Sequence, residues 1–130
     1  MNKNFLIDTH TLLWFLEDSK KLSSKAKNLI EHSREGNISI SIASFWEIAI
    51  KLSIGKLKTN ISLKSLIKKT IEEKIDILHI TPESLVEVEN LPFYHKHPFD
   101  RMIIATAITI QVLIISKDEK FDKYEIERIW

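Results

Sequence analysis

The chain is 130 residues long, with 44% hydrophobic and 28% charged residues, no cysteine and a formal net charge of +1. This composition predicts one globular domain over residues 1–130, and it excludes disulfide scaffolds, thiolate metal sites, cysteine nucleophiles and a polycationic nucleic-acid binder. The sequence shows no signal peptide and no apolar run long enough to span a bilayer, so we expect a cytoplasmic protein with no membrane contact.

Short apolar runs predict strands, and apolar residues that recur every three or four positions predict helices. In chain order, these patterns predict a strand at 4–7, helices at 11–16 and 23–34, a strand at 38–42, helices at 43–53 and 62–73, a strand at 75–78, a helix from 81–82, a loop at 91–98, a helix at 99–109, a strand at 112–115 and a last short strand near 127–130. Ser23 or Ser24 and Thr81 are expected N-caps, while Glu35-Gly36 and Gly55 are expected to stop helices.

The predicted strands are apolar on both faces, which is typical of strands buried in a parallel sheet. Because strands and helices alternate along the whole chain, we expect an α/β fold in three α/β/α layers, with a central parallel sheet covered by helices on both sides. In such folds, ligand sites form beyond the carboxyl ends of the strands.

Four acidic residues are candidates for that edge. Asp8 follows the first strand, Asp118 follows the strand at 112–115, and Glu47 lies one turn into the helix after the second strand. A parallel sheet brings these three together. Asp100 joins them only if the helix at 99–109 begins beside the same edge, which the preceding loop allows but does not require.

Each acid also has a purely structural explanation when taken singly. Asp8 could cap a helix, Glu47 could pair with Lys51, Asp100 suits the positive end of a helix dipole, and Asp118 could belong to an ordinary turn. Their joint position at the ends of several strands favours a functional site.

Several carboxylates that meet in one place repel each other, and a bound cation removes that penalty. Oxygen ligands without thiolates fit Mg²⁺, or Mn²⁺, better than Zn²⁺. Such an ion activates a water molecule for in-line attack on a phosphodiester. Attack by water without the 2′-hydroxyl of RNA leaves a 5′-phosphate.

Other phosphate chemistries fit the sequence less well. Gly36 and Gly55 are the only glycines, so there is no glycine-rich phosphate loop. The segment after Asp8 lacks the second aspartate of haloacid-dehalogenase-type phosphotransferases. A phosphoacceptor receiver domain would carry an acid where this chain has His79.

These motifs resemble the PIN-domain ribonucleases, and most closely the VapC-type toxins of bacterial toxin–antitoxin modules. The resemblance extends over almost the whole chain, through four motifs in order: Leu6–Trp14 with Asp8, Ser44–Lys51 with Glu47, Pro98–Arg101 with Asp100, and Ser116–Asp118 followed by Phe121 and Tyr124, with Asp118 as the acid and Ser116 as its hydroxyl partner. It implies a Mg²⁺-dependent endoribonuclease toxin that is inhibited by a cognate antitoxin and forms a homodimer. Relatives often carry Asp where this chain has His97, and Gln where it has Thr106.

Five neighbours of the acids are candidates for supporting the site or contacting the substrate: Thr9, His10, Lys51, Arg101 and Ser116. His10 either contacts RNA or fills the start of a helix. Arg101 either binds an RNA phosphate or holds the carboxylates in place, and Lys51 could do the same for Glu47.

Three further points stay open at the level of sequence. His95 and His97 could bind zinc together with Asp100, or could be ordinary loop residues. The apolar side chains of Leu12, Leu13, Phe15 and Leu16 indicate burial against a partner, either a second copy or an antitoxin. The main functional alternative is a PIN-like module that binds RNA or protein without cutting; a phosphatase or a DNA nuclease with the same site is another.

Overall fold

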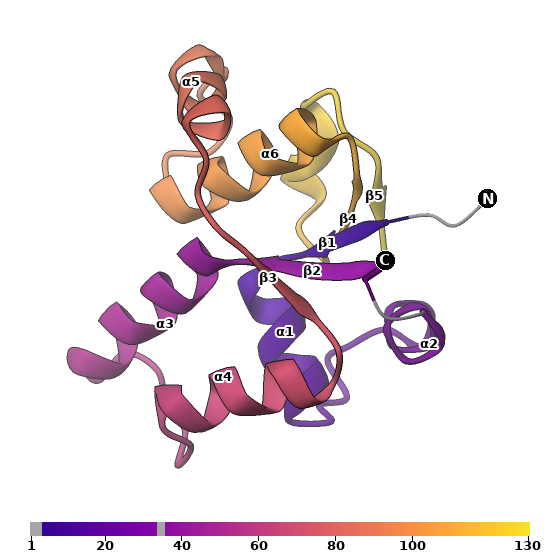
Figure 1. Ribbon diagram of the computed structural model, residues 1–130, viewed down its shortest axis with the longest axis vertical. Helices are drawn as coiled ribbons and strands as arrows, with labels where there is room; N and C mark the ends of the chain where they lie inside the picture. Colours follow the sequence, from indigo (N-terminus) through magenta and orange to yellow (C-terminus); the bar gives the residue numbers. More distant parts are fainter. Residues whose placement is uncertain (1–3, 34–35) are drawn as a thin grey trace.

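The computed structural model describes residues 4–33 and 36–130, and Figure 1 shows strands and helices alternating along this part of the chain. The elements are β1 (Phe5–Ile7), α1 (Thr9–Leu16), α2 (Ser24–His32), β2 (Ile38–Ser41), α3 (Ile42–Ser53), α4 (Leu63–Glu72), β3 (Asp76–Leu78), α5 (Pro82–Asn90), α6 (Pro98–Ile110), β4 (Leu113–Ile115), the 3-10 helix η1 (Glu119–Lys123) and β5 (Arg128–Ile129). None of the described helices is long and apolar enough to cross a bilayer.

The five strands form one parallel sheet in the order β3-β2-β1-β4-β5. The first strand of the chain therefore lies at the centre, with β2 on one side and β4 on the other. Ile7 at the end of β1 pairs with Ile40 of β2 and with Ile115 of β4. The residues that follow these three positions consequently leave the sheet at the same edge, which is the arrangement the sequence predicted.

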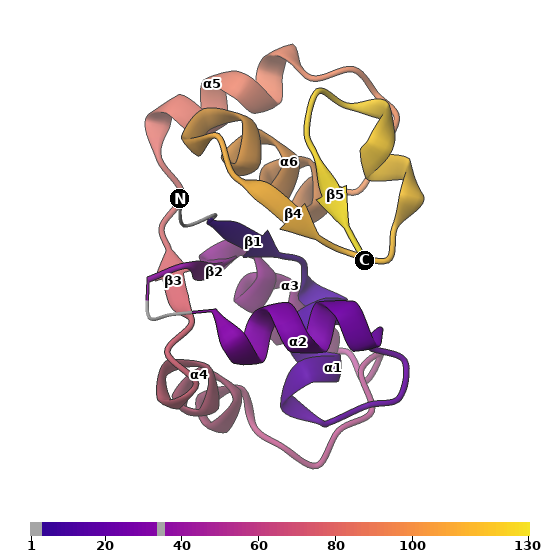
Figure 2. The same cartoon turned by 90° about the vertical axis from the view of Figure 1, so that its right-hand side faces the viewer.

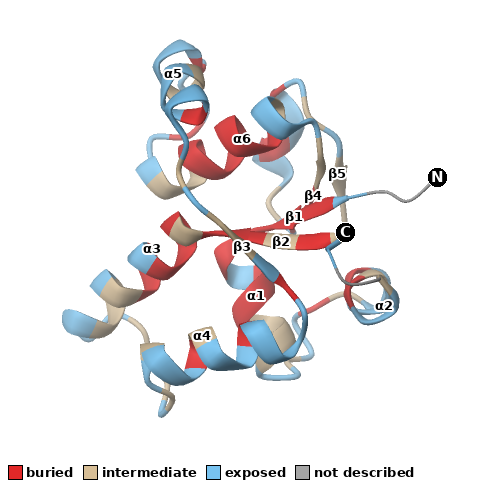
Figure 3. Ribbon diagram, in the orientation of Figure 1, coloured by how far each residue is buried: buried red, intermediate tan, exposed pale blue. Residues whose placement is uncertain are grey.

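Helices cover both faces of the sheet, so the fold is the expected three-layer α/β/α sandwich (Figures 1 and 2). Alternate residues of β1 point to opposite faces. Phe5 and Ile7 pack in the core formed with α1, α2, α3 and α4, while Leu6 packs against α6 and the segment around η1. Figure 3 shows that buried residues are concentrated in the central strands, in α1 and in α6.

Capping side chains set most helix boundaries. Asp8 accepts a hydrogen bond from the backbone of Thr11, so α1 begins at Thr9, two residues earlier than the apolar pattern predicted. Ser23 caps α2 and Thr81 caps α5, as expected. Helix α2 ends at His32, and Arg34 and Glu35, where the sequence placed its end and stop signal, lie outside the described residues.

The expectation that the apolar residues of α1 cover a partner is wrong. Leu12 and Leu13 are buried in the main core, and Phe15 and Leu16 pack against it. Helix α1 is apolar on most of its surface because it lies beneath the sheet and also contacts α3 and α4. The large exposed apolar side chains lie instead on α3 and its C-cap, on α4 and α5, in the loop after α5 and at the end of α6.

Candidate active site

Four acidic side chains meet beyond the carboxyl edge of the sheet. Asp8 is the N-cap of α1 directly after β1, and Asp118 is the N-cap of η1, three residues after β4. Glu47 lies in the second turn of α3, which follows β2 without a loop. Asp100 is the third residue of α6, whose first turn lies at this edge. The structure thus brings all four sequence-predicted acids together.

Asp8 is buried and fixed by hydroxyl groups. The hydroxyl of Ser116 donates to its Oδ2 atom at 2.6 Å, while the backbone N–H of Thr11 at 3.0 Å and the Thr11 hydroxyl both donate to Oδ1. Burial raises the pKa of Asp8, and these hydrogen bonds from Ser116 and Thr11 offset only part of the rise. Thr11 was missed at the level of sequence, although its spacing of three residues from Asp8 is typical of N-capping.

Ser116 has a different partner from the one expected. Its hydroxyl donates to the carboxylate of Asp8 and accepts the backbone N–H of Asp118 at 3.0 Å, so it does not bind the Asp118 carboxylate. The reason is register: Ser116 follows Ile115 and Asp8 follows Ile7, and these two isoleucines pair in the sheet. Ser116 therefore couples the first motif to the fourth.

Glu47 is buried but accepts donors on both carboxylate oxygens. The hydroxyl of Thr9 donates to Oε1 at 2.6 Å, and the ammonium of Lys51 donates to Oε2 at 2.8 Å. Burial alone would raise the pKa of Glu47, but hydrogen bonds from Lys51 and Thr9, together with the Lys51 charge, bring it below its ordinary value. Glu47 is thus held ionised, and Thr9 and Lys51 are its supporting residues.

Asp100 is the second acid, after Asp8, whose pKa is raised. Burial raises its pKa, the negative charges of Glu47 and Asp8 raise it further, and His97 opposes the rise. The His97 ring lies between two acids, with Nδ1 3.8 Å from Asp100 and Nε2 3.7 Å from Glu47. His97 thus places an imidazole beside the two carboxylates.

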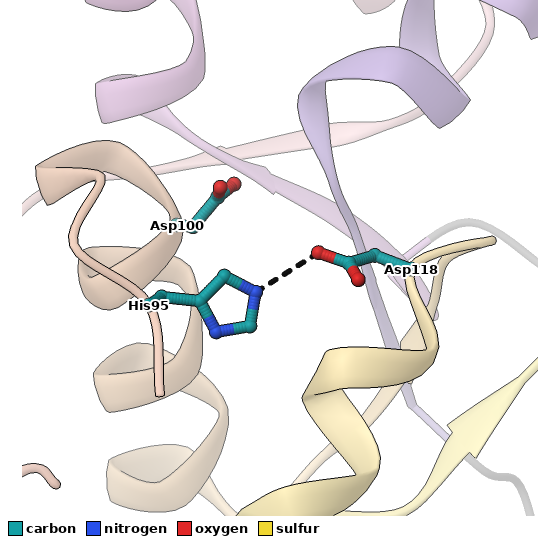
Figure 4. Close-up of side chains that lie close together, drawn as sticks. All are labelled: His95, Asp100 and Asp118. Carbon is teal, nitrogen blue, oxygen red and sulfur yellow. Dashed lines mark hydrogen bonds and ion pairs between the residues drawn. The ribbon is translucent and has the colours of Figure 1, made fainter. Parts of the chain in front are cut away.

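Asp118 is held by a buried histidine. Nε2 of His95 lies 2.9 Å from Oδ2 of Asp118 (Figure 4). The backbone N–H of Lys120 donates to Oδ1 of Asp118 at 3.0 Å. Burial tends to raise the pKa of Asp118, but these two hydrogen bonds and the neighbouring positive charges bring it below its ordinary value. The donor atoms of His95, Asp100 and Asp118 lie within 4.8 Å of one another.

The expectation that Arg101 contacts RNA or holds the carboxylates is wrong. Its side chain is buried, and its guanidinium donates to four backbone carbonyls of the preceding segment. These belong to Val88, Leu91, Pro92 and His95, at distances between 2.9 and 3.3 Å. The loop between α5 and α6 has little regular hydrogen bonding, so Arg101 satisfies its carbonyls and fixes the position of His95.

A hollow of about 300 Å³ lies against two of the acids. Asp8 and Asp118 form part of its wall, and His10, Trp14 and Lys117 line the rest. The ring of His10 lies 5.7 Å from that of Trp14, and the Lys117 ammonium lies 5.9 Å from the same indole. His10 is therefore exposed beside the site. Lys117 was missed by sequence reasoning, although it lies between Ser116 and Asp118.

The donor set fits a divalent cation. Most of the available ligand atoms are carboxylate oxygens, which hard divalent ions prefer, and one imidazole nitrogen lies among them. Burial disfavours the ionised forms of Asp8 and Asp100, so a positive ion held between them would relieve a cost that the protein's own hydrogen bonds leave uncompensated. The arrangement can hold such an ion and bring it to a phosphate group.

Comparison with known proteins identifies the family. Residues 5–127 match the family model of the PIN domain. Ribonuclease VapC22 of Mycobacterium tuberculosis (strain ATCC 25618 / H37Rv) is 27% identical over 124 residues, which cover 95% of this chain and 93% of that protein.

Solved structures share the fold. A toxin-antitoxin complex from Klebsiella pneumoniae contains a chain with a TM-score of 0.65 and 18% identity, covering 98% of this chain and 97% of that one. FitAcB from Neisseria gonorrhoeae gives a TM-score of 0.67 at 14% identity, covering 97% and 96%. At these identities the likeness shows the fold alone.

The raised pKa of Asp100 predicts that Asp100→Asn stabilises the metal-free protein at pH 7. Folding raises the pKa of Asp100 above its ordinary value of 3.8, so the ionised carboxylate destabilises the folded protein. This destabilisation is complete at pH values above the folded-state pKa and vanishes below about pH 3.8. In EDTA, we expect a higher Tm for Asp100→Asn at pH 7 and a gain that shrinks toward zero as the pH approaches 3.8. Glu125→Gln, which removes an exposed acid, should change Tm little; a lower Tm for Asp100→Asn at pH 7 would contradict the electrostatic account.

Proposed function

Because this chain belongs to the PIN-domain family, we propose that it is a metal-dependent endoribonuclease whose active site is formed by Asp8, Glu47, Asp100 and Asp118. The observation that carries the proposal is the convergence of these four acids, from four separate segments, at the carboxyl edge of the sheet. The relative that covers almost the whole chain is named a ribonuclease, which supports RNA as the substrate.

The ion we propose is Mg²⁺ or Mn²⁺, held by Asp8, Asp100 and Asp118, with Glu47 completing the cluster. When bound, a divalent ion lowers the pKa of water and neutralises charge on the phosphate. The neighbouring residues orient the acids and set their ionisation. Ser116 and Thr11 orient Asp8, while Thr9 and Lys51 keep Glu47 ionised. Attack by water in line with the 3′-oxygen leaves a 5′-phosphate.

RNA is proposed to enter through the hollow beside Asp8 and Asp118. Lys117 supplies a positive charge for a phosphate next to the scissile one, and Trp14 with His10 offers aromatic surface for a base. Stacking of this kind needs an unpaired base, so the hollow favours single-stranded RNA or a loop. We place the activity in the cytoplasm.

We further propose that the protein is the toxin of a toxin–antitoxin pair. Support comes from the solved toxin-antitoxin complex of Klebsiella pneumoniae, to which the chain is similar in fold over nearly its whole length. A cognate antitoxin protein is therefore the proposed partner of this chain.

An exposed apolar surface supports a homodimer. Trp46 and Ile50 of α3 and Ile54 at its C-cap recur every four residues and are 59%, 38% and 57% exposed. Trp46 also lines an apolar hollow of about 340 Å³ with residues of α5 and α6, including Leu85 and Phe99. A surface of this kind is more typical of a protein interface than of a monomer, and a second copy supplies a matching face by symmetry.

The first prediction of this proposal concerns cleavage. We expect the protein to cut single-stranded RNA with Mg²⁺ or Mn²⁺ and to be inactive in EDTA. Asp8→Asn or Asp100→Ala should reduce the rate by at least about 100-fold, since loss of a ligand costs more than loss of the outer groups that orient ligands, which costs roughly 10–100-fold. Gel assays of end-labelled RNA and matched DNA, with mapping of the 5′ ends, measure this.

Three outcomes of that assay would count against the proposal. Robust RNA cleavage by the EDTA-treated protein would overturn metal dependence. Equal cleavage of DNA would overturn the assignment to RNA. Ion binding without cleavage of any RNA would favour a non-catalytic PIN-like module. In cells, induced expression should arrest growth, and Asp100→Ala, or co-expression of a small neighbouring gene, should relieve the arrest.

The second prediction concerns the RNA-binding hollow. Lys117→Gln should raise the KM for RNA about 10-fold and change kcat less, because a charged contact to phosphate contributes roughly 1.5–3 kcal/mol to binding. Lys64→Gln, which removes a lysine from α4, is the matched control. A KM that is the same in both variants would show that RNA does not use this hollow.

The third prediction concerns assembly. The double variant Ile50→Lys/Ile54→Lys should halve the mass measured by light scattering, because the charges disrupt the apolar surface of α3. Ile71→Lys, at a residue of α4 that is 58% exposed, should leave the mass unchanged. A wild-type protein that is monomeric at all concentrations would contradict the homodimer.

A further inference from the structure

His95 lies buried beside Asp100 and Asp118. It is only 6% exposed, and its Nε2 atom points at Asp118 from 2.9 Å (Figure 4). We propose that His95 is itself a ligand of the divalent ion, binding through Nε2 together with the carboxylates of Asp100 and Asp118. This inference rests on the metal-dependent site proposed above, and it adds a nitrogen ligand that the four-acid site does not contain.

The distances suit three ligands of one ion. Two donor atoms that are each about 2.1 Å from an ion lie about 3.0 Å apart at a right angle and about 4.2 Å apart on opposite sides. The separation between His95 Nε2 and Asp118 Oδ2 is 2.9 Å, and all three donor atoms lie within 4.8 Å of one another. Small side-chain movements therefore suffice to close the site on an ion.

The other ring nitrogen of His95 already has a suitable partner. A histidine that binds a metal through one nitrogen usually donates a hydrogen bond from the other. Nδ1 of His95 lies 3.2 Å from the hydroxyl of Tyr124, which also accepts the backbone N–H of His95 at 2.8 Å and lies 3.5 Å from the carbonyl of Pro92. In the metal-free site Nε2 carries the proton that it donates to the Asp118 carboxylate. A bound ion would displace that proton and leave the ring protonated on Nδ1, which would then donate to Tyr124 while Tyr124 donates to Pro92.

The ring is also held from several sides. Phe121 and Tyr124 pack against it, with ring centres at 4.9 and 5.5 Å, and Arg101 holds its backbone carbonyl at 3.3 Å. A histidine that only filled space would not require this orientation toward two carboxylates. Fixed orientation is what a metal ligand needs, because it lowers the cost of ordering the side chain on binding.

His97 does not share this role. Its side chain is 43% exposed, and its two nitrogens face different acids, Nε2 at 3.7 Å from Glu47 and Nδ1 at 3.8 Å from Asp100. The donor cluster found in the described residues contains His95, Asp100 and Asp118. The paired zinc site that the sequence allowed, with both histidines on one ion, is therefore replaced by a single imidazole among carboxylates.

A nitrogen ligand changes which ions the site prefers. Mg²⁺ favours oxygen ligands, whereas imidazole raises the affinity for transition-metal ions in the order Mn²⁺, Co²⁺, then Zn²⁺. We therefore expect this site to bind Mn²⁺ and Co²⁺ more tightly than Mg²⁺. Removing the imidazole should reduce Co²⁺ affinity much more than Mg²⁺ affinity.

The test measures ion binding directly, on the full chain after EDTA treatment and dialysis. Calorimetric titrations with Mg²⁺, Mn²⁺ and Co²⁺ compare the wild type with His95→Gln and with His32→Gln, which removes an exposed histidine from α2. We expect His95→Gln to weaken Co²⁺ binding by about 10-fold or more, and His32→Gln to leave it unchanged. Pulsed electron paramagnetic resonance of bound Mn²⁺ should show coupling to a directly bound nitrogen in the wild type and in His32→Gln, but not in His95→Gln.

Tyr124→Phe keeps the aromatic packing and removes only the hydroxyl, so it tests the proposal even if His95→Gln fails to fold by circular dichroism. We expect this variant to keep the nitrogen coupling and to bind Co²⁺ more weakly than the wild type. Bound Mn²⁺ without nitrogen coupling in the wild type would overturn His95 as a ligand and leave the nuclease proposal intact. A wild-type protein that neither binds an ion nor cleaves RNA would overturn the proposed function itself.

Discussion

The structure depends on holding several carboxylates close together at one edge of a parallel sheet. Like charges in a partly buried place repel each other and lose hydration, which opposes folding. The chain offsets this with hydroxyl and ammonium donors at Asp8 and Glu47, and with a buried histidine at Asp118. The pKa values of Asp8 and Asp100 nevertheless stay raised, so the site remains electrostatically prepared for a cation.

The need to hold these acids close together explains why several side-chain hydrogen bonds fix the segment between α5 and α6. It must bring Asp100 and two histidines to an edge that belongs to β1, β2 and β4. Arg101 binds four carbonyls of this segment, and Tyr124 joins it to the region after η1. Although Arg101 follows Asp100 directly in the sequence, its guanidinium thus binds backbone carbonyls of this segment.

The two sides of the sheet serve different purposes. The core under α1–α4 fixes β1 and β2 and thereby Asp8 and Glu47, while the core under α6 and η1 fixes Asp100, Asp118 and His95. The acids are therefore supplied by both halves of the molecule. Packing on either side decides whether they remain within reach of one ion.

The sequence by itself determined the layered α/β fold, the parallel sheet and the identity of the four acids, because strand and helix periodicities and the order of elements are local properties. It also predicted that Asp8, Glu47 and Asp118 meet, since parallel strands end at one edge. Only the tertiary structure decided the partners of these residues. The register in which β1 and β4 pair places the Ser116 hydroxyl within hydrogen-bonding distance of Asp8. Contacts between segments that are distant in the sequence bury Arg101 and the apolar face of α1. Such contacts also place His95, and not His97, against Asp118. Such pairings depend on how distant segments pack, and no local pattern encodes them.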